Sequence, residues 1–182
     1  MIAIGDKAKN LKVSEWVQGG PIEIEKEKGK VILIEVFQVN CPGCFLYGLP
    51  MAQVFHQTYK DKGLLVIGLA TAFEDFEVNN FENLKLVVNK GVAIGEPKRV
   101  LKEEGLLKKG DKLHFKIDFP VAMDKLKKID ENYYLPETFE EYGLKGTPSS
   151  IVIDKEGKVR YISFGYDEKL EKIIKKLLKI SL

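Results

Sequence analysis

The stretch Val31-Ile-Leu-Ile-Glu-Val-Phe37, followed by Cys41-Pro-Gly-Cys44, decides the fold. Its first part is an almost continuous apolar run, which is typical of a strand buried in the centre of a sheet. Its second part contains both cysteines of the chain and leads into a stretch with helix signals. A Cys-X-X-Cys pair between a buried strand and a helix indicates a redox dithiol.

The position of the two cysteines predicts different roles for them. A helix N-terminus lowers the pKa of a nearby thiol and favours the thiolate, which is the form that attacks a disulfide. We therefore expect Cys41 to be the nucleophile. Cys44 lies one helical turn further on and should be more shielded, so we expect it to resolve the mixed disulfide.

Two other interpretations of the cysteines are a zinc half-site and a pair of ordinary core residues. A structural zinc site needs four ligands, and His56 and His114 are far apart in the sequence. Core cysteines would be scattered over apolar faces, whereas this pair brackets Pro42 and Gly43. The spacing favours the redox dithiol, and we expect no metal.

The length and charge of the chain limit its class. A chain of 182 residues can bury one substantial core, and no linker divides it, so we expect a single domain over residues 1–182. The 29 Lys and Arg against 27 Asp and Glu leave a net charge of +2, which argues against a nucleic-acid partner. The N-terminus lacks signal-peptide features and no run reaches transmembrane length, so we expect a cytoplasmic protein without a membrane partner. Nothing in the sequence indicates an oligomeric state.

The first half of the chain reads as a strand–helix–strand unit. Strands are predicted at 22–25, 31–37 and 64–70, and a helix at 44–59, in which Pro50 marks a kink or a restart. A parallel pair of strands joined by a helical crossover is the expected result.

The second half begins less regularly. Helices are predicted at 81–89, with Leu84, Val87 and Val88 as the apolar stripe, and from Pro97 to Glu104. Residues 106–116 read as a loop or an irregular strand, and 119–123 as a short apolar segment leading into another loop.

The last third of the chain is more regular. A short helix at 137–142 should end at Gly143, and strands at 149–153 and 159–164 should form an antiparallel hairpin. A terminal helix from Leu170 has apolar residues at helical spacing, so we expect it to cover the sheet.

This order of elements, with Gly146-Thr-Pro148 directly before the hairpin, resembles the thioredoxin superfamily and most closely its TlpA-type or redoxin branch. Further landmarks of that branch are Gly5-Asp-Lys-Ala8, the strand that starts at Gly29, and Phe119-Pro-Val-Ala-Met-Asp124. The resemblance covers nearly the whole chain. It implies an α/β fold, a thioredoxin-like three-layer α/β/α sandwich with a central mixed sheet and an N-terminal extension. It also implies an inserted segment at roughly 73–116, between the dithiol half and the hairpin.

The resemblance also implies roles for the residues around the dithiol. Pro148 would be a cis-proline beside the cysteines, whereas most X-Pro bonds in folded proteins are trans. Thr147 would contact Cys41 or the backbone of an extended substrate segment. Pro42 and Gly43 would complete the substrate-binding surface.

Glu35 lies where thioredoxins have a buried acid beneath the second cysteine. Burial should raise the pKa of its carboxyl group, which could then take the proton from Cys44 during resolution. The alternatives are a glutamate that reaches the sheet edge or one that pairs with a lysine.

The sequence departs from the family pattern beside the first cysteine. Asn40 replaces the usual tryptophan, so the aromatic platform for partners is missing and partner choice should differ. The dipeptide Pro42-Gly43 reverses the usual Gly-Pro order, which affects the redox potential and leaves the direction of electron flow open. The segment 73–116 is a candidate to cover or shape the substrate groove.

The function that we expect from these features is that of a thiol:disulfide oxidoreductase acting on protein or small-molecule disulfides. No metal or organic cofactor is implied, and electrons would come from a partner reductase, since the chain has no dinucleotide motif.

Two alternative functions use the same cysteines. In a peroxiredoxin-like thiol peroxidase, Cys41 would become a sulfenic acid, but Gln38 stands where a threonine is expected and Arg99 and Arg160 have no obvious route to the thiolate. In a metal-binding module of the same fold, His114 could supply a third ligand.

Overall fold

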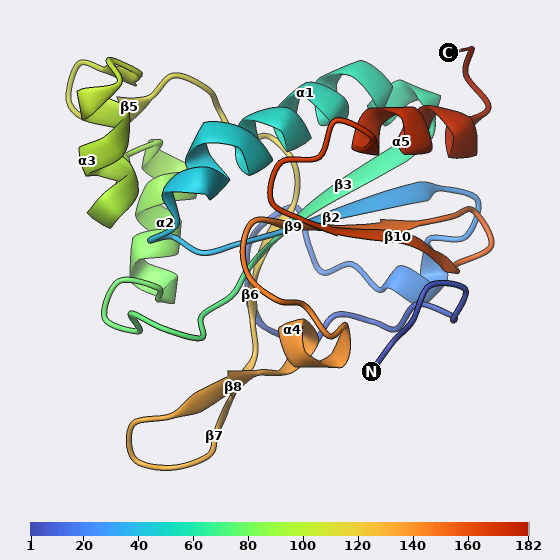
Figure 1. The fold of residues 1–182 in the computed structure, drawn as a ribbon, viewed down its shortest axis with the longest axis horizontal. Helices are drawn as coiled ribbons and strands as arrows, with labels where there is room; N and C mark the ends of the chain where they lie inside the picture. Colours follow the sequence, from blue (N-terminus) through green and yellow to red (C-terminus); the bar gives the residue numbers. More distant parts are fainter. Residues whose placement is uncertain (182) are drawn as a thin grey trace.

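The computed structural model describes residues 1–181. Their fold has a central mixed sheet with other elements of the chain packed on both of its faces (Figure 1). Within this range the central sheet has six strands in the order β1-β6-β3-β2-β9-β10. Their bounds are β1 Val13–Gln18, β2 Val31–Phe37, β3 Leu64–Ala70, β6 Val121–Asp124, β9 Ser149–Ile153 and β10 Val159–Phe164. β2 and β6 run parallel to β3, whereas β9 is antiparallel to β2 and β10, and β1 is antiparallel to β6. The predicted α/β fold with a central mixed sheet is confirmed.

The two faces of the sheet are covered differently. Helices α1 (Leu49–Tyr59) and α5 (Leu170–Leu178) lie over one face, and α4 (Glu137–Glu141) lies on the other side (Figure 1). Alternate residues of β2 serve the two layers, with Leu33 in the first cluster and Ile34 in the second. Among residues 1–181, no helix combines the length and the apolar character needed to span a membrane.

The crossover between β2 and β3 is helical, as predicted. Cys44–Gly48 is one stretch of π-helix and α1 continues from Leu49, with Pro50 in its first turn. Pro50 has no N–H to donate, which suits it to the start of a helix. The sequence predicted a kink or a restart at Pro50, and the structure shows the helix changing from π to α beside this residue.

The segment after β3 contains α2 (Phe81–Lys90), α3 (Gly95–Glu103) and a small hairpin of β4 (Leu107–Lys108) and β5 (Lys112–Leu113). The predicted apolar stripe of α2 is buried. Helix α3 begins two residues before the predicted Pro97. These elements lie beside the N-terminal end of α1 (Figure 1).

The predicted strand at 22–25 is wrong. Ile24–Lys26 is a 3-10 helix, and Ile24 is buried against one face of the sheet. Both hydrogen-bonding edges of β2 are already occupied by β3 and β9, so the preceding segment has no free edge beside β2. The alternation of Ile22 and Ile24 therefore comes from packing on the face of the sheet rather than from strand pairing.

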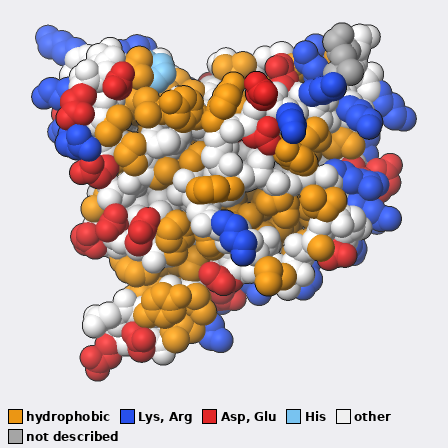
Figure 2. Space-filling view, in the orientation of Figure 1, with side chains coloured by type: hydrophobic (Ala, Val, Ile, Leu, Met, Phe, Trp, Pro, Cys, Tyr) orange, Lys and Arg blue, Asp and Glu red, His pale blue; other side chains and the backbone are white. Residues whose placement is uncertain are grey.

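Residues 119–123 were predicted to be a short apolar segment that leads into a loop. In the structure Val121–Asp124 is instead strand β6, which joins the central sheet. A hairpin of β7 (Leu126–Lys128) and β8 (Tyr134–Pro136) follows and projects from the body of the molecule (Figure 1). Ile129 and Tyr133 are exposed near its tip, and hydrophobic side chains cover part of this projection (Figure 2).

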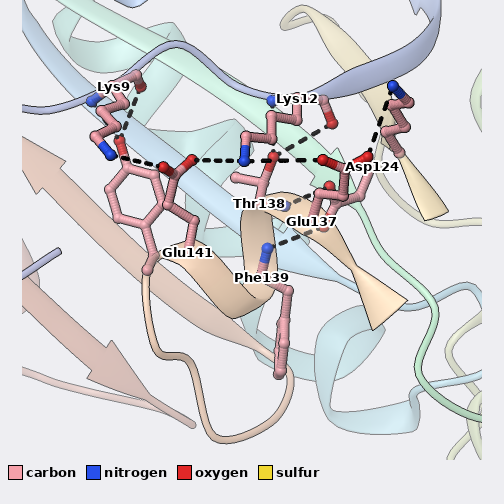
Figure 3. A network of polar contacts seen from close by, with 9 residues as sticks. Lys9, Lys12, Asp124, Glu137, Thr138, Phe139 and Glu141 are labelled. Carbon is pink, nitrogen blue, oxygen red and sulfur yellow. Dashed lines mark hydrogen bonds and ion pairs between the residues drawn. The ribbon is translucent and has the colours of Figure 1, made fainter. Parts of the chain in front are cut away.

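A buried carboxylate fixes the segment that leads to Pro148. Asp124 accepts hydrogen bonds from the backbone N–H groups of Thr138 (2.9 Å) and Phe139 (3.0 Å) and from the hydroxyl of Thr71 (3.1 Å). It thereby binds the first turn of α4, while Lys12 forms ion pairs with glutamates of that helix (Figure 3). Burial raises the pKa of Asp124, although these hydrogen bonds oppose the rise.

The last third of the chain folds as predicted. Helix α4 is followed by Gly143, whose φ of +61° suits a residue without a Cβ. β9 and β10 form the predicted antiparallel hairpin, and α5 buries Leu170, Ile174 and Leu178 against the sheet.

Candidate active site

Cys41 and Cys44 form a disulfide where the chain leaves β2 and enters the helix. Cys41 is half-buried, whereas Cys44 is fully buried. The backbone N–H of Cys44 donates to Cys41 Sγ over 3.2 Å, which would stabilise a thiolate on that sulfur after reduction. Only Cys41 is therefore accessible to a substrate, as its predicted role as nucleophile requires.

The segment before β9 lies directly against the dithiol. The Thr147–Pro148 peptide bond is cis, as predicted. Cys41 Sγ lies 3.5 Å from the carbonyl oxygen of Thr147. A Cβ atom on Gly43 would lie 3.6 Å from Pro148 Cδ, so the proline ring also faces the turn between the cysteines. The structure thus brings Thr147 and Pro148 together with the dithiol.

Glu35 lies inside the molecule, beneath the helix that follows the dithiol. Its side chain is fully buried in β2, and burial raises the pKa of its carboxyl group to about 8, although the hydroxyl of Ser150 donates to Oε2 over 2.7 Å and opposes the rise. Within residues 1–181, Oε1 has no hydrogen-bond partner. Because β2 is an inner strand and no Lys or Arg among residues 1–181 pairs with Glu35, neither alternative predicted for this glutamate is present.

Gly48 lets Glu35 approach the dithiol helix. A Cβ atom at Gly48 would collide with Glu35 Oε1 and would lie 2.8 Å from Pro148 Cβ. Gly48 follows Cys44 by one helical turn, so the carboxyl group, the helix and the cis-proline meet at this glycine. Local sequence patterns gave no signal for this contact.

An open groove of about 310 Å³ runs past Cys41. The dithiol turn lines it with Gln38, Asn40 and Pro42, the hairpin side with Gly146, Thr147 and Phe164, and the segment after β3 with Phe73 and Glu74. Phe164 is 61% exposed, and its ring lies over Gly146, where a Cβ atom would approach Cε2 to 2.6 Å. The two phenylalanines were not predicted as site residues, because each is a single aromatic residue outside any motif.

The histidines and arginines lie elsewhere. His56 is on α1 beside Phe119, where burial lowers its pKa, and His114 packs on Phe115. Within residues 1–181 no group of three His, Cys, Asp or Glu side chains is arranged to hold a metal ion. Arg99 pairs with glutamates of α3 and Arg160 with Asp154, and neither lines the groove at Cys41.

Comparisons with known proteins agree with this geometry. The family model described as Redoxin matches residues 3–178. The chain is 28% identical over 176 residues to the thiol-disulfide oxidoreductase ResA of Bacillus anthracis, covering 96% of this chain and 78% of ResA. It is 30% identical over 148 residues to protein DipZ of Mycobacterium tuberculosis, covering 80% of this chain but only 16% of DipZ.

A solved structure shows the same architecture over nearly all of this chain. The thiol-disulfide isomerase from Corynebacterium glutamicum superposes with a TM-score of 0.72 at 33% identity, covering 97% of this chain and 98% of that one. The order of the strands, the Cys41–Cys44 disulfide and the match over residues 3–178 agree with one another. The chain therefore belongs to the redoxin family, with a thioredoxin-like fold and a Cys-X-X-Cys disulfide at its candidate active site.

Proposed function

We propose that this protein is a thiol-disulfide oxidoreductase whose reactive group is the Cys41–Cys44 pair. The observation that carries the proposal is the asymmetry of the disulfide, with a half-buried Cys41 and a fully buried Cys44 beside the cis-proline. The activities in the printed names of ResA and of the Corynebacterium isomerase support it.

The reaction proceeds in two exchange steps when the dithiol reduces a substrate. The Cys41 thiolate attacks one sulfur of the substrate disulfide, forms a mixed disulfide and releases the other sulfur as a thiolate that takes up a proton. The Cys44 thiolate then attacks Cys41 Sγ, forms the Cys41–Cys44 disulfide and releases the second substrate thiol. Two electrons pass from the protein to the substrate, and a reductase must return them.

Glu35 serves the proton transfers at Cys44. A carboxyl group with a pKa of about 8 exists in both protonation states near neutral pH. The ionised form can accept the Cys44 proton during resolution, and the acid form can return it when the disulfide is opened. We assign this exchange to Oε1, which lies against Gly48, one turn after Cys44, and has no hydrogen-bond partner in the part of the chain that the structure describes.

The groove fits an extended segment of a protein substrate. Thr147 offers backbone groups beside Cys41, as a sheet edge does for an added strand. Phe73 and Phe164 line the groove with apolar surface, while Pro42 and Gly43 lie at the turn between the cysteines. Asn40 provides no aromatic surface at this groove, and Phe73 and Phe164 supply it instead. The cytoplasmic location expected from the sequence stays a prediction.

Trapping of the mixed disulfide tests the proposal. Cys44→Ser should attack a disulfide-linked peptide and remain attached to it through Cys41, because no second thiol can release it. Cys41→Ser is the matched control and should form far less adduct, since Cys44 is fully buried. Intact-protein mass spectrometry measures both. Equal labelling of the two variants, or labelling of neither, would contradict the proposed roles.

A further inference from the structure

Asn40, the residue before the nucleophile, is held by the segment that follows β3. Its backbone N–H donates to Asn79 Oδ1 over 2.8 Å, and its Nδ2 donates to Asp75 Oδ2 over 2.8 Å. Its Oδ1 accepts from the backbone N–H of Glu96, also over 2.8 Å. Asn40 is therefore bonded on three sides to residues that precede α2 or begin α3.

A second layer of hydrogen bonds supports the first. Asn79 is 2% exposed, and its Nδ2 donates to the carbonyl of Glu74 (2.9 Å) and to Gln38 Oε1 (3.3 Å). Gln38 Oε1 also accepts from the backbone N–H of Phe73 over 3.1 Å. The turn from Gln38 to Cys41, closed by the Cys41 N–H donating to the Gln38 carbonyl (3.2 Å), is thus held from outside along its length.

Helix α3 and Asn40 are matched to each other. The N-cap residue of α3 is Ile94, whose side chain has no hydrogen-bond acceptor. Asn40 Oδ1 supplies the missing acceptor to the backbone N–H of Glu96. Gly95 has a φ of +59°, and a Cβ atom there would collide with Asn40 Oδ1. A glycine is therefore needed at position 95 for two reasons. It adopts the positive φ without strain, and it leaves room for the side chain of Asn40.

We propose that Asn40 is a positioning residue for the nucleophile, and that Asn40, Asp75, Asn79 and the Glu96 N–H form a clamp that holds Cys41 at the start of its helix. The inference rests on the proposed function. In the oxidised protein the disulfide itself fixes Cys41. After reduction that link is gone, and the clamp keeps Cys41 Sγ beside the Cys44 N–H and the Thr147 carbonyl.

The clamp should therefore act on the reduced state more than on the oxidised state. Asn40→Ala should raise the pKa of the Cys41 thiol toward that of a free cysteine and slow its attack on a small disulfide about tenfold, since both depend on alignment with the helix N-terminus. We also expect Asn40→Ala to shift the redox equilibrium toward the disulfide, because the reduced state loses the stabilised thiolate. A tenfold shift of this equilibrium would make the reduction potential about 30 mV more negative. A merely structural role would destabilise both redox states alike.

Asn80→Ala is the matched control. Asn80 Oδ1 accepts from Asn83 N–H over 2.9 Å and caps α2, but Asn80 has no hydrogen bond to the turn at Cys41. This variant loses the same kind of side chain from the same segment. It should lower the melting temperature while the thiol pKa and the attack rate stay at their wild-type values.

Variants at Asp75 separate the effect of the hydrogen bond to Asn40 from the effect of the negative charge of Asp75. They test the proposal even if Asn40→Ala does not fold. Asp75→Asn keeps an acceptor for Asn40 and suits the φ of +47°, so it removes only the charge. Asp75→Gly removes the acceptor as well and tolerates the same positive φ, so the two variants do not differ in backbone strain. We expect Asp75→Gly, and not Asp75→Asn, to slow the attack and raise the thiol pKa.

The readouts are the thiolate absorbance of reduced Cys44→Ser variants against pH, the attack rate, and the potential of the variants with both cysteines. An Asn40→Ala variant that matches wild type in all three readouts would overturn the proposal, and so would equal effects of Asp75→Asn and Asp75→Gly. A wild-type dithiol that attacks no disulfide would overturn the proposed function itself, which is a separate result.

Discussion

Glu35→Gln should change how the stability of the protein depends on pH. The buried carboxyl group has a pKa of about 8 in the folded protein, compared with 4.5 for an unburied group. Between these two values the folded protein holds a proton that the unfolded chain has released. Folding therefore takes up a proton in this pH window. Because protons become scarcer as pH rises, the free energy of unfolding falls as pH rises from 4.5 to about 8.

The size of the effect follows from the two pKa values. Each pH unit between them costs about 1.4 kcal/mol, so the full rise from 4.5 to about 8 corresponds to at most about 5 kcal/mol. Glutamine has no proton to release and keeps an acceptor for the hydroxyl of Ser150. Above about pH 8 the acid is ionised in both states, and the difference between the two proteins should stop growing.

The assay is denaturant unfolding of oxidised wild type and Glu35→Gln from pH 5 to pH 9. The stability of the variant relative to wild type should rise steadily up to about pH 8. Glu77→Gln, which alters an exposed glutamate, is the control and should follow wild type. A constant difference between Glu35→Gln and wild type across this range would refute the reasoning that burial keeps this group protonated.

Two further substitutions test the contacts that position the site. Asp124→Ala should lower the free energy of unfolding by about 3 kcal/mol, because it leaves the buried N–H groups of Thr138 and Phe139 without an acceptor; chemical denaturation measures this, and a loss below about 1 kcal/mol would contradict it. Gly48→Ala should cost about 1–3 kcal/mol, because the added methyl group collides with Glu35 and Pro148. Gly43→Ala has ordinary contact distances and should cost less, so equal thermal unfolding of the two alanine variants would argue against the close approach at Gly48.

The sequence predicted the elements whose signals are local. β2 and β3 are apolar runs, the last hairpin is bracketed by turn residues, and α5 has clear helical spacing, so each lies where it was expected. The cis-proline and the burial of Glu35 were predicted from the resemblance to the family rather than from local patterns.

The elements that the sequence did not predict depend on distant partners. β1 pairs with β6 more than a hundred residues later, and its half-exposed side chains give no clear alternation. The strand expected at 22–25 failed because the pattern of Ile22 and Ile24 does not distinguish packing on a sheet face from pairing within a sheet. The contacts of Asn40 join residues 35 to 56 positions apart, so no local pattern could indicate them.

The most direct test of the redox function is an equilibrium titration of the Cys41–Cys44 pair in dithiothreitol and glutathione buffers, with thiol trapping as the readout. We expect one two-electron transition in which both thiols appear together. A midpoint near −270 mV would resemble thioredoxin and indicate a reductant, whereas about −120 to −180 mV would indicate an oxidant or isomerase. Failure of the two cysteines to form an intramolecular disulfide at any potential would contradict the proposed function.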